Sequence, residues 1–208
     1  MTEQAKTIHF MINDQPVEAR EGWTVLETAR QYGIHIPTLC YHEAVEPSGG
    51  CRLCVVELRE GNWSKVVISC MYPVQEGINI YTESDRVNNV RRWVLEMLLA
   101  ECPASTEIRA LAAKYGVNGT RFPSKNPEEQ CMLCGLCVRV CREVVGVSAI
   151  TTIGRGVHKF VGAPYDKPSE ACVACGSCVT ICPTGAMRAR LDRVRGSGHH
   201  SHHSANKA

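Results

Sequence analysis

The sequence predicts an α+β protein in which two small cysteine-containing modules flank a helical middle section. Short strand-like runs and one helix-like run alternate up to about residue 82, a long apolar helical pattern follows, and eight of the thirteen cysteines lie between residues 131 and 182. The chain has 208 residues and 44% hydrophobic content, which is enough to bury a core in one to three small domains. We expect domains at residues 1–82, 83–122 and 123–190, followed by a flexible histidine-rich tail at residues 191–208.

The first module is expected to open with a β-hairpin, because Lys6–Asn13 and Val17–Arg20 are strand-like runs around a turn-like break. A helix follows over residues 24–31, where Thr24 can act as the N-cap and Glu27 completes a capping box. Two further strand-like runs are Val55–Leu58 and Val66–Ser69.

Four cysteines of this module have the spacing C-x10-C-x2-C-x15-C, and they are Cys40, Cys51, Cys54 and Cys70. Four thiolates are the ligand set of a [2Fe–2S] cluster. We expect a flexible glycine-rich loop at residues 48–50 to let three of them surround the cluster, while a strand end supplies the fourth. The alternative is a zinc knuckle built on Cys51 and Cys54.

The middle section predicts two helices. Residues 84–101 carry an apolar face that is too broad for a surface helix and includes Trp93 and Met97, so this helix should pack between the two cluster modules. Ser105 begins a second helix that runs to Tyr115. Between them stands Cys102, which we interpret as a buried structural thiol.

The third module contains two near-copies of the pattern C-x2-C-x2-C-x3-C. This spacing is typical of two-cluster ferredoxins, in which the fourth cysteine of each run binds the cluster of the other run. We expect each fourth cysteine to start a short helix. Separated C-x2-C pairs would be more typical of structural zinc. The predicted ligands are Cys131, Cys134, Cys137 and Cys182 for the first [4Fe–4S] cluster, and Cys141, Cys172, Cys175 and Cys178 for the second.

Two features near these cysteines have mainly structural interpretations. The segment between the two runs contains strand-like Ala149–Ile153 and Val157–Val161, which predict an inserted hairpin. Arg52 and Arg139 lie within cluster loops and could tune a reduction potential, but ordinary surface charges are the favoured interpretation.

Composition excludes several classes of function. A net charge of +2 and 6% aromatic residues argue against a nucleic-acid partner. No run approaches the ~20 apolar residues that a membrane span requires, and Met1–Phe10 does not have the pattern of a signal peptide. Thirteen cysteines without a secretion signal favour a reducing compartment, which we take to be the cytoplasm. No dinucleotide-binding G-x-G-x-x-G and no P-loop is evident, so we expect no catalysis by the chain alone.

The segments Ile36–Cys40 and Gly50–Glu57, together with Cys70, resemble the N-terminal ferredoxin domain of the respiratory complex I large iron–sulfur subunit. The same module occurs in iron-only hydrogenases and in the small diaphorase subunit of NAD-reducing hydrogenases and formate dehydrogenases. The resemblance covers about Lys6–Ala189. It implies a β-grasp fold for the first module and a ferredoxin-like fold for the last. The chain departs from most such proteins in lacking the H-x3-C-x2-C-x5-C ligands of an extra cluster in the middle section, so we expect three clusters.

The resemblance also implies a function. The chain would be an electron-transfer subunit with one [2Fe–2S] and two [4Fe–4S] clusters, which carries single electrons between a flavin-containing NAD(P)-binding subunit and a separate catalytic or electron-accepting subunit. A soluble ferredoxin is a further candidate partner. One alternative is a free-standing ferredoxin-like carrier, against which the broad apolar middle helix argues. Another is a zinc-stabilised scaffold without a redox role.

Overall fold

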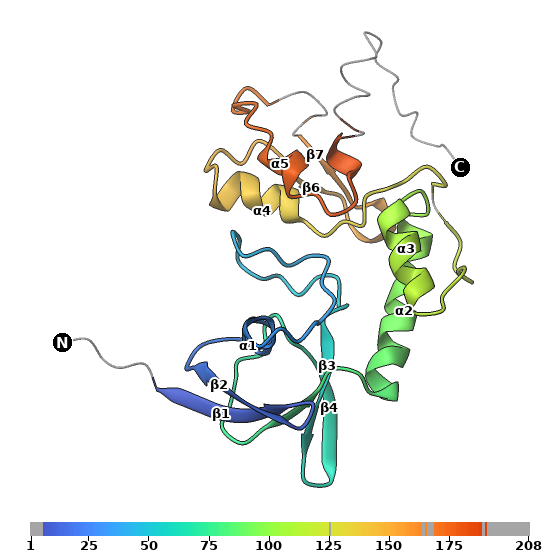
Figure 1. Cartoon of the computed structure of the whole chain (residues 1–208). Helices are drawn as coiled ribbons and strands as arrows, with labels where there is room; N and C mark the ends of the chain where they lie inside the picture. Colours follow the sequence, from blue (N-terminus) through green and yellow to red (C-terminus); the bar gives the residue numbers. More distant parts are fainter. Residues whose placement is uncertain (1–5, 125, 164, 166–168, 189, 191–208) are drawn as a thin grey trace, which may run out of the picture.

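The computed structural model describes residues 6–124, 126–163, 165, 169–188 and 190. A β-sheet domain occupies one end of the molecule and the cysteine-rich C-terminal loops occupy the other (Figure 1). The helices α2 and α3 run along one side, and the loop after α1 extends from the sheet domain toward α4 (Figure 1). The predicted histidine-rich tail lies outside the described residues.

The N-terminal domain is built on a mixed five-stranded sheet with the order β2-β1-β5-β3-β4. The predicted hairpin of β1 and β2 is present, and the two further strand-like runs pair as a second hairpin, β3 and β4. Strand β5 lies between the two hairpins, parallel to β1 and antiparallel to β3. Three residues are too few to show an alternating pattern, which explains why β5 was not predicted. The strands are β1 (Thr7–Ile12), β2 (Gln15–Arg20), β3 (Val55–Glu60), β4 (Trp63–Ile68) and β5 (Asn79–Tyr81).

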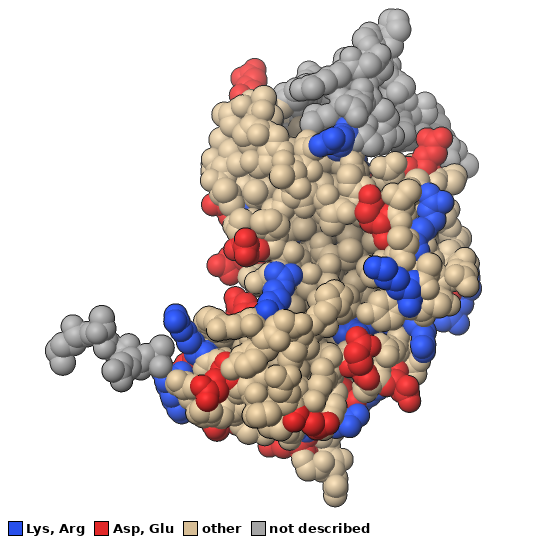
Figure 2. Space-filling model, in the orientation of Figure 1, with Lys and Arg blue, Asp and Glu red and all other residues tan. Residues whose placement is uncertain are grey.

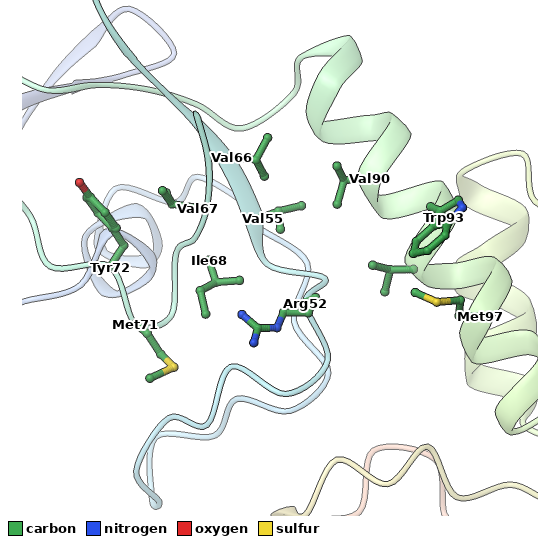
Figure 3. Close-up of a pocket in the computed structure, with 11 residues that line it drawn as sticks. Arg52, Val55, Val66, Val67, Ile68, Met71, Tyr72, Val90, Trp93 and Met97 are labelled. Atoms are coloured by element: carbon green, nitrogen blue, oxygen red, sulfur yellow. The ribbon is translucent and has the colours of Figure 1, made fainter. Parts of the chain in front are cut away.

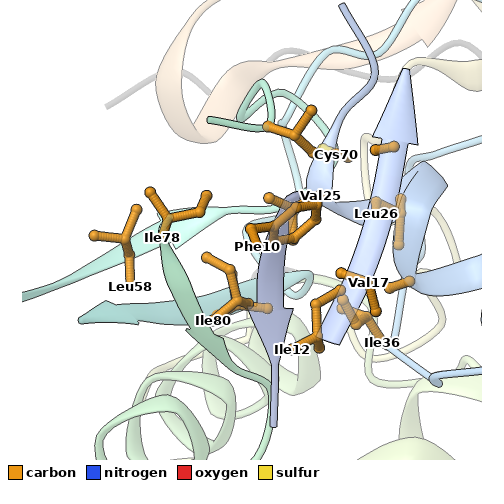
Figure 4. Packing of buried hydrophobic residues seen from close by; sticks show 14 of the residues in the cluster. Phe10, Ile12, Val17, Val25, Leu26, Ile36, Leu58, Cys70, Ile78 and Ile80 are labelled. Atoms are coloured by element: carbon orange, nitrogen blue, oxygen red, sulfur yellow. The ribbon is translucent and has the colours of Figure 1, made fainter. Parts of the chain in front are cut away.

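Helix α1 (Val25–Gln31) has the predicted capping box. The amide of Glu27 donates to the Thr24 hydroxyl over 3.2 Å, and the amide of Thr24 donates to the Glu27 carboxylate over 2.7 Å. The helix contributes Leu26 to a core in which Phe10 and Ile80 of the sheet are also buried (Figure 4). Cys54 and Cys70 belong to the same core, so the folding of this domain directly positions two of the predicted ligands.

The middle section forms α2 (Asp85–Glu101) and α3 (Thr106–Lys114), with Ser84 and Ser105 as their N-caps. A second hydrophobic core unites Leu95 of α2 with Cys40 of the first module and Met132 of the third. Helix α2 therefore packs between the modules as predicted. Part of its apolar face is nevertheless uncovered, because Trp93 is 51% exposed and Met97 is 38% exposed.

The C-terminal module consists mostly of loops. The predicted hairpin is present, but residues 156–158 form a 3-10 turn, so its second strand starts later than the sequence predicted. Within the described residues, no helix has both the length and the apolar character needed to cross a bilayer. The elements are α4 (Leu136–Glu143), β6 (Thr151–Ile153), η1 (Gly156–His158), β7 (Phe160–Gly162) and α5 (Ser177–Thr180).

Candidate metal centres

The four predicted ligands of the first module are all buried, with at most 8% of each residue exposed. Cys40 and Cys51 lie on the loop between α1 and β3, and the Cys51 amide donates to the Cys40 sulfur over 3.3 Å. Cys54 directly precedes β3, and Cys70 follows the end of β4. Ser69 links the segments that carry Cys54 and Cys70. Its hydroxyl donates to the Cys54 carbonyl over 2.7 Å, and its amide donates to the same carbonyl over 3.0 Å.

The protonation of these thiols is governed by contacts within two pairs. A hydrogen bond from the Cys51 thiol is the main cause that lowers the pKa of Cys40 to about 5, and the Cys70 thiol in the same way lowers the pKa of Cys54 to about 6. The pKa values of Cys51 and Cys70 are raised, because each gives up its hydrogen bond on ionising and because both are buried. Two of the four thiols, Cys40 and Cys54, thus ionise readily to thiolate, the form that binds metal, while Cys51 and Cys70 stay protonated as their hydrogen-bond donors.

The two cysteine runs of the third module share one backbone conformation. Leu133 and Ala174 both adopt left-handed geometry, with φ of 55° and 53°, and Gly135 and Gly176, two residues further along, have φ of 74° and 76°. Left-handed conformation is uncommon for residues other than glycine, so its recurrence at equivalent positions indicates two loops of the same shape. Such loops turn successive N–H groups inward, which suits an anionic group such as a thiolate-bound cluster.

The expected start of a helix at each fourth cysteine was wrong. Helix α4 begins at Leu136, so that Cys137 and Cys141 both lie within it, on successive turns of one helix face. In the second run the helix is only four residues long, and Cys182 lies beyond its end. The left-handed glycine at each N-cap determines where the helix starts, because the chain must reverse there before it can become helical.

The surroundings of Cys137 show which thiols lie near one another in the first run. Its pKa is raised to about 12, chiefly by burial and further by the nearby sulfurs of Cys134, Cys131 and Cys182. Cys182 comes from the end of the second run, yet it acts electrostatically on the first triplet. Cys182 therefore lies near the first triplet, and because Cys178 also packs against the hydrophobic cluster around Cys137, the interleaved assignment of ligands stays a prediction.

The predicted ligands of the second [4Fe–4S] cluster likewise come from both cysteine runs. Burial is the main cause that raises the pKa of Cys178, followed by the neighbouring sulfurs of Cys175, Cys141 and Cys172. Cys141 of the first run thus lies beside the second triplet. Among the described residues, no three His, Cys, Asp or Glu side chains converge as ligands of a single ion. A cluster of several irons requires a wider set of thiols than one tetrahedral zinc, whose sulfur ligands all lie about 2.3 Å from the metal.

The first cysteine run lies against the loop of the N-terminal module. A cavity of about 180 Å³ is bounded on one side by Gly50 and Cys51 and on the other by Met132 and Cys134. The pKa of Cys134 is raised to about 11, mainly by burial, and Cys40 of the other module is among the charges that contribute. Thiols of both predicted sites therefore lie in one continuous buried region.

Two side chains near the clusters behave differently from each other. Arg52 is exposed, as expected for a surface charge. Arg139 is only 8% exposed, so its interpretation as a surface charge was wrong. Its burial results from contacts with residues more than ninety positions away, which no local pattern reveals.

Cys102 has the properties of a structural thiol. It is fully buried, and its sulfur lies 3.1 Å from the Leu98 carbonyl one helical turn earlier. Burial is the main cause that raises its pKa to about 12, which keeps the thiol protonated.

An apolar groove of about 530 Å³ opens between the sheet and α2. In Figure 3 the side chains of Ile68 and Met71 approach it from the sheet side, and those of Val90, Trp93 and Met97 approach it from the helix. Charged side chains of both signs are interspersed on the face that Figure 2 shows, mostly over the sheet domain and the helices.

The class of protein follows from two family matches. Residues 5–85 match the family described as a 2Fe-2S iron-sulfur cluster binding domain, and residues 130–186 match the one described as a 4Fe-4S dicluster domain. The chain is therefore an iron–sulfur protein of the ferredoxin type, with an N-terminal [2Fe–2S] domain and a C-terminal dicluster domain. The predicted α+β class is confirmed.

Individual relatives narrow this class. The chain is 33% identical over 172 residues to the NADH-ubiquinone oxidoreductase 75 kDa subunit of Reclinomonas americana, a match that covers 72% of this chain and 25% of that protein. It is 30% identical over 174 residues to a subunit of the NADH-quinone oxidoreductase of Rickettsia prowazekii, a match that covers 73% of this chain and 26% of that one. The chain thus spans about a quarter of the length of the curated relatives it matches.

A solved structure is similar over nearly its whole length. A chain in the crystal structure of NAD+-reducing [NiFe]-hydrogenase in the H2-reduced state superposes with a TM-score of 0.74 at 30% identity, over 86% of both chains. This protein belongs to the family of iron–sulfur electron-transfer subunits that includes that hydrogenase chain and the N-terminal region of the complex I 75 kDa subunit.

Proposed function

We propose that this chain carries single electrons between a flavin-containing NAD(P)-binding subunit and a separate catalytic subunit of the hydrogenase or formate dehydrogenase type. The chain would not be catalytic alone. A [2Fe–2S] cluster would be held by Cys40, Cys51, Cys54 and Cys70. The first [4Fe–4S] cluster would be held by Cys131, Cys134, Cys137 and Cys182, and the second by Cys141, Cys172, Cys175 and Cys178. Such clusters exchange one electron at a time.

The observation that carries this proposal is the shared buried region between the two modules. Cys40 and Cys51 belong to the same hydrophobic core as Met132, and Cys134 packs against that core. Thiols of both predicted sites are thus packed in one hydrophobic core, which brings the two sites close together across the boundary between the modules. A carrier with independent sites would have no need to join them in this way.

An assembled subunit fits the surface better than a free-standing carrier does. The groove along α2 exposes Trp93 and Met97, and exposed apolar patches of this kind commonly mark protein interfaces. All thirteen cysteines are free thiols, which supports the reducing cytoplasm as the compartment.

The first test is the metal content of anaerobically purified protein, with EPR of the reduced sample. We expect about ten irons per chain, from one [2Fe–2S] and two [4Fe–4S] clusters, and no stoichiometric zinc. Zinc at four equivalents or fewer, without an EPR signal, would refute the electron-transfer role and leave a structural scaffold.

Ligand pairing is tested by Cys182→Ala, with Cys102→Ala as the matched control. We expect Cys182→Ala to damage the cluster of the first run, although residue 182 lies in the second, and Cys102→Ala to leave the iron content unchanged. Loss of only the second-run cluster in Cys182→Ala would disprove the interleaved assignment.

The need for a flavin partner is tested with NADH and NADPH. The isolated iron-loaded chain should keep its visible absorption when either is added, because it lacks a centre that accepts hydride. Addition of the flavin-containing subunit should bleach that absorption. Bleaching of the isolated chain would contradict the assignment of a non-catalytic subunit.

A further inference from the structure

Arg139 is a buried cation that links the two cluster modules. It lies on α4 between Cys137 and Cys141, yet its guanidinium reaches the loop that carries Cys40. One terminal nitrogen donates to the Cys40 carbonyl over 2.8 Å, and the other donates to the carbonyl of Glu46. A single side chain of the dicluster module thus binds two carbonyls of the [2Fe–2S] loop, six residues apart.

Two neighbouring contacts support the same attachment. Val45 is buried against Leu136 and Val140 of α4. The carboxylate of Glu143, one turn after Arg139, accepts a hydrogen bond of 2.9 Å from the Glu46 amide. Loop 40–46 is therefore held on one face of α4 by an apolar contact flanked by two polar ones.

The charge of Arg139 is incompletely compensated by the protein. No carboxylate lies within 4.0 Å of it in the described part of the chain, and its Nε is buried there without a hydrogen-bond partner. The pKa of the Glu143 carboxyl is lowered mainly by its hydrogen bond from Arg142, 2.6 Å away, and only to a lesser extent by the charge of Arg139, so this acid is already paired with another cation. A buried cation is costly unless negative charge lies close to it. The predicted ligands Cys137 and Cys141 lie on this helix, and the clusters that they would help to bind would supply that charge.

We propose that Arg139 is a positioning residue, which holds the [2Fe–2S] loop against the first [4Fe–4S] loop and stabilises the reduced [2Fe–2S] centre with its buried charge. This inference rests on the proposed function, because it needs the clusters to be present. Arginine suits the role because its planar fork can serve two acceptors at once, which the single ammonium group of lysine cannot do in the same geometry.

The test compares Arg139→Gln, Arg139→Lys and the control Arg142→Gln. Arg142 lies on the same helix with its side chain 62% exposed, so its replacement makes the same change of charge without touching the loop. Three quantities are measured on the iron-loaded chain: iron per chain, hydrogen exchange of the peptide spanning residues 40–48, and the midpoint potential of the [2Fe–2S] centre.

We expect Arg139→Gln to keep its iron, to exchange at least tenfold faster in that peptide, and to lower the equilibrium constant for [2Fe–2S] reduction about tenfold, a shift of about −59 mV for one electron. Arg139→Lys should exchange faster but keep a potential near that of the wild type. Arg142→Gln should change neither quantity.

The outcomes distinguish the inference from the function on which it rests. If the wild-type protein binds no iron, the proposed function itself is refuted. Iron-loaded Arg139→Gln that matches Arg142→Gln in exchange and potential would overturn only the role of Arg139. If Arg139→Gln loses its iron, the test passes to Arg139→Lys. Hydrogen exchange of the 40–48 peptide in Arg139→Lys at the wild-type rate would then overturn the inference.

Discussion

Gly49 should be indispensable to the [2Fe–2S] loop, whereas its neighbour Gly50 should not. Gly49 is buried with φ of +59°, and a Cβ at this position would lie 2.7 Å from both the Ile68 Cδ1 and the Met71 Sδ. Gly50 is exposed, lacks the positive φ, and would place a Cβ no closer than 3.7 Å to the Ser48 hydroxyl. The loop that we expected to be flexible is thus closely packed at Gly49.

The cost of Gly49→Ala has two parts. Left-handed backbone costs a residue with a side chain about 1–2 kcal/mol. Displacing the packed Ile68 side chain adds about 1 kcal/mol or more, at the lower end of overpacking costs, because the half-exposed Met71 can turn away. The sum of about 2–3 kcal/mol corresponds to a change of about thirty- to a hundredfold in the folding equilibrium.

The assay is an anaerobic urea titration of the iron-loaded protein, followed by visible circular dichroism of the [2Fe–2S] centre. Gly49→Ala should lose this signal at a clearly lower urea concentration than the wild type, and Gly50→Ala should follow the wild type. Equal midpoints for the two variants would refute the packing and backbone argument for this loop.

Further predictions concern buried polar groups and thiols. Arg91→Met should lower the free energy of unfolding by about 1–3 kcal/mol, because the fully buried Arg91 donates to the Val55 carbonyl over 2.9 Å and its loss leaves that carbonyl without this donor. The control Arg92→Met replaces an exposed arginine and should change the thermal midpoint little. Mass spectrometry after iodoacetamide labelling of metal-free protein should find Cys175 modified first. Cys175 is exposed, and hydrogen bonds from Ser177 are the main cause that lowers its pKa, so its thiolate forms at a lower pH. Ser177→Ala should move the labelling profile to higher pH, and an unchanged profile would contradict that cause. Buried Cys102, with its pKa raised to about 12, should remain unlabelled in the folded protein at pH 7, and early labelling there would contradict its placement in the core.

Local signals in the sequence predicted local structure well. The Thr24–Glu27 capping box and the serine N-caps of α2 and α3 occur where the sequence indicated them, because a cap depends on residues only two or three positions apart. The repeated cysteine spacing likewise indicated two loops of one shape, since their backbone is determined within each run.

Features that depend on distant partners were not predictable in this way. The burial of Arg139 arises from carbonyls 93 and 99 positions earlier in the chain. The exposure of Trp93 and Met97 depends on how far the sheet extends over α2, and a helical periodicity does not encode that extent. The strand β5 exists because β1 and β3 leave a gap of one strand between them, which is a property of the assembled sheet.

That central strand has a consequence for synthesis on the ribosome. The two hairpins of the sheet are hydrogen-bonded to each other only through β5, as far as the described chain shows. Asn13 after β1 and its hydrogen-bond partner Thr82 after β5 are 69 positions apart. At ~5–20 residues per second, the first hairpin therefore waits about 4–14 s for the strand that completes its sheet. Cys40, Cys51, Cys54 and Cys70 all leave the ribosome within that interval, so delivery of iron to the nascent chain would meet a site whose protein walls have not yet closed.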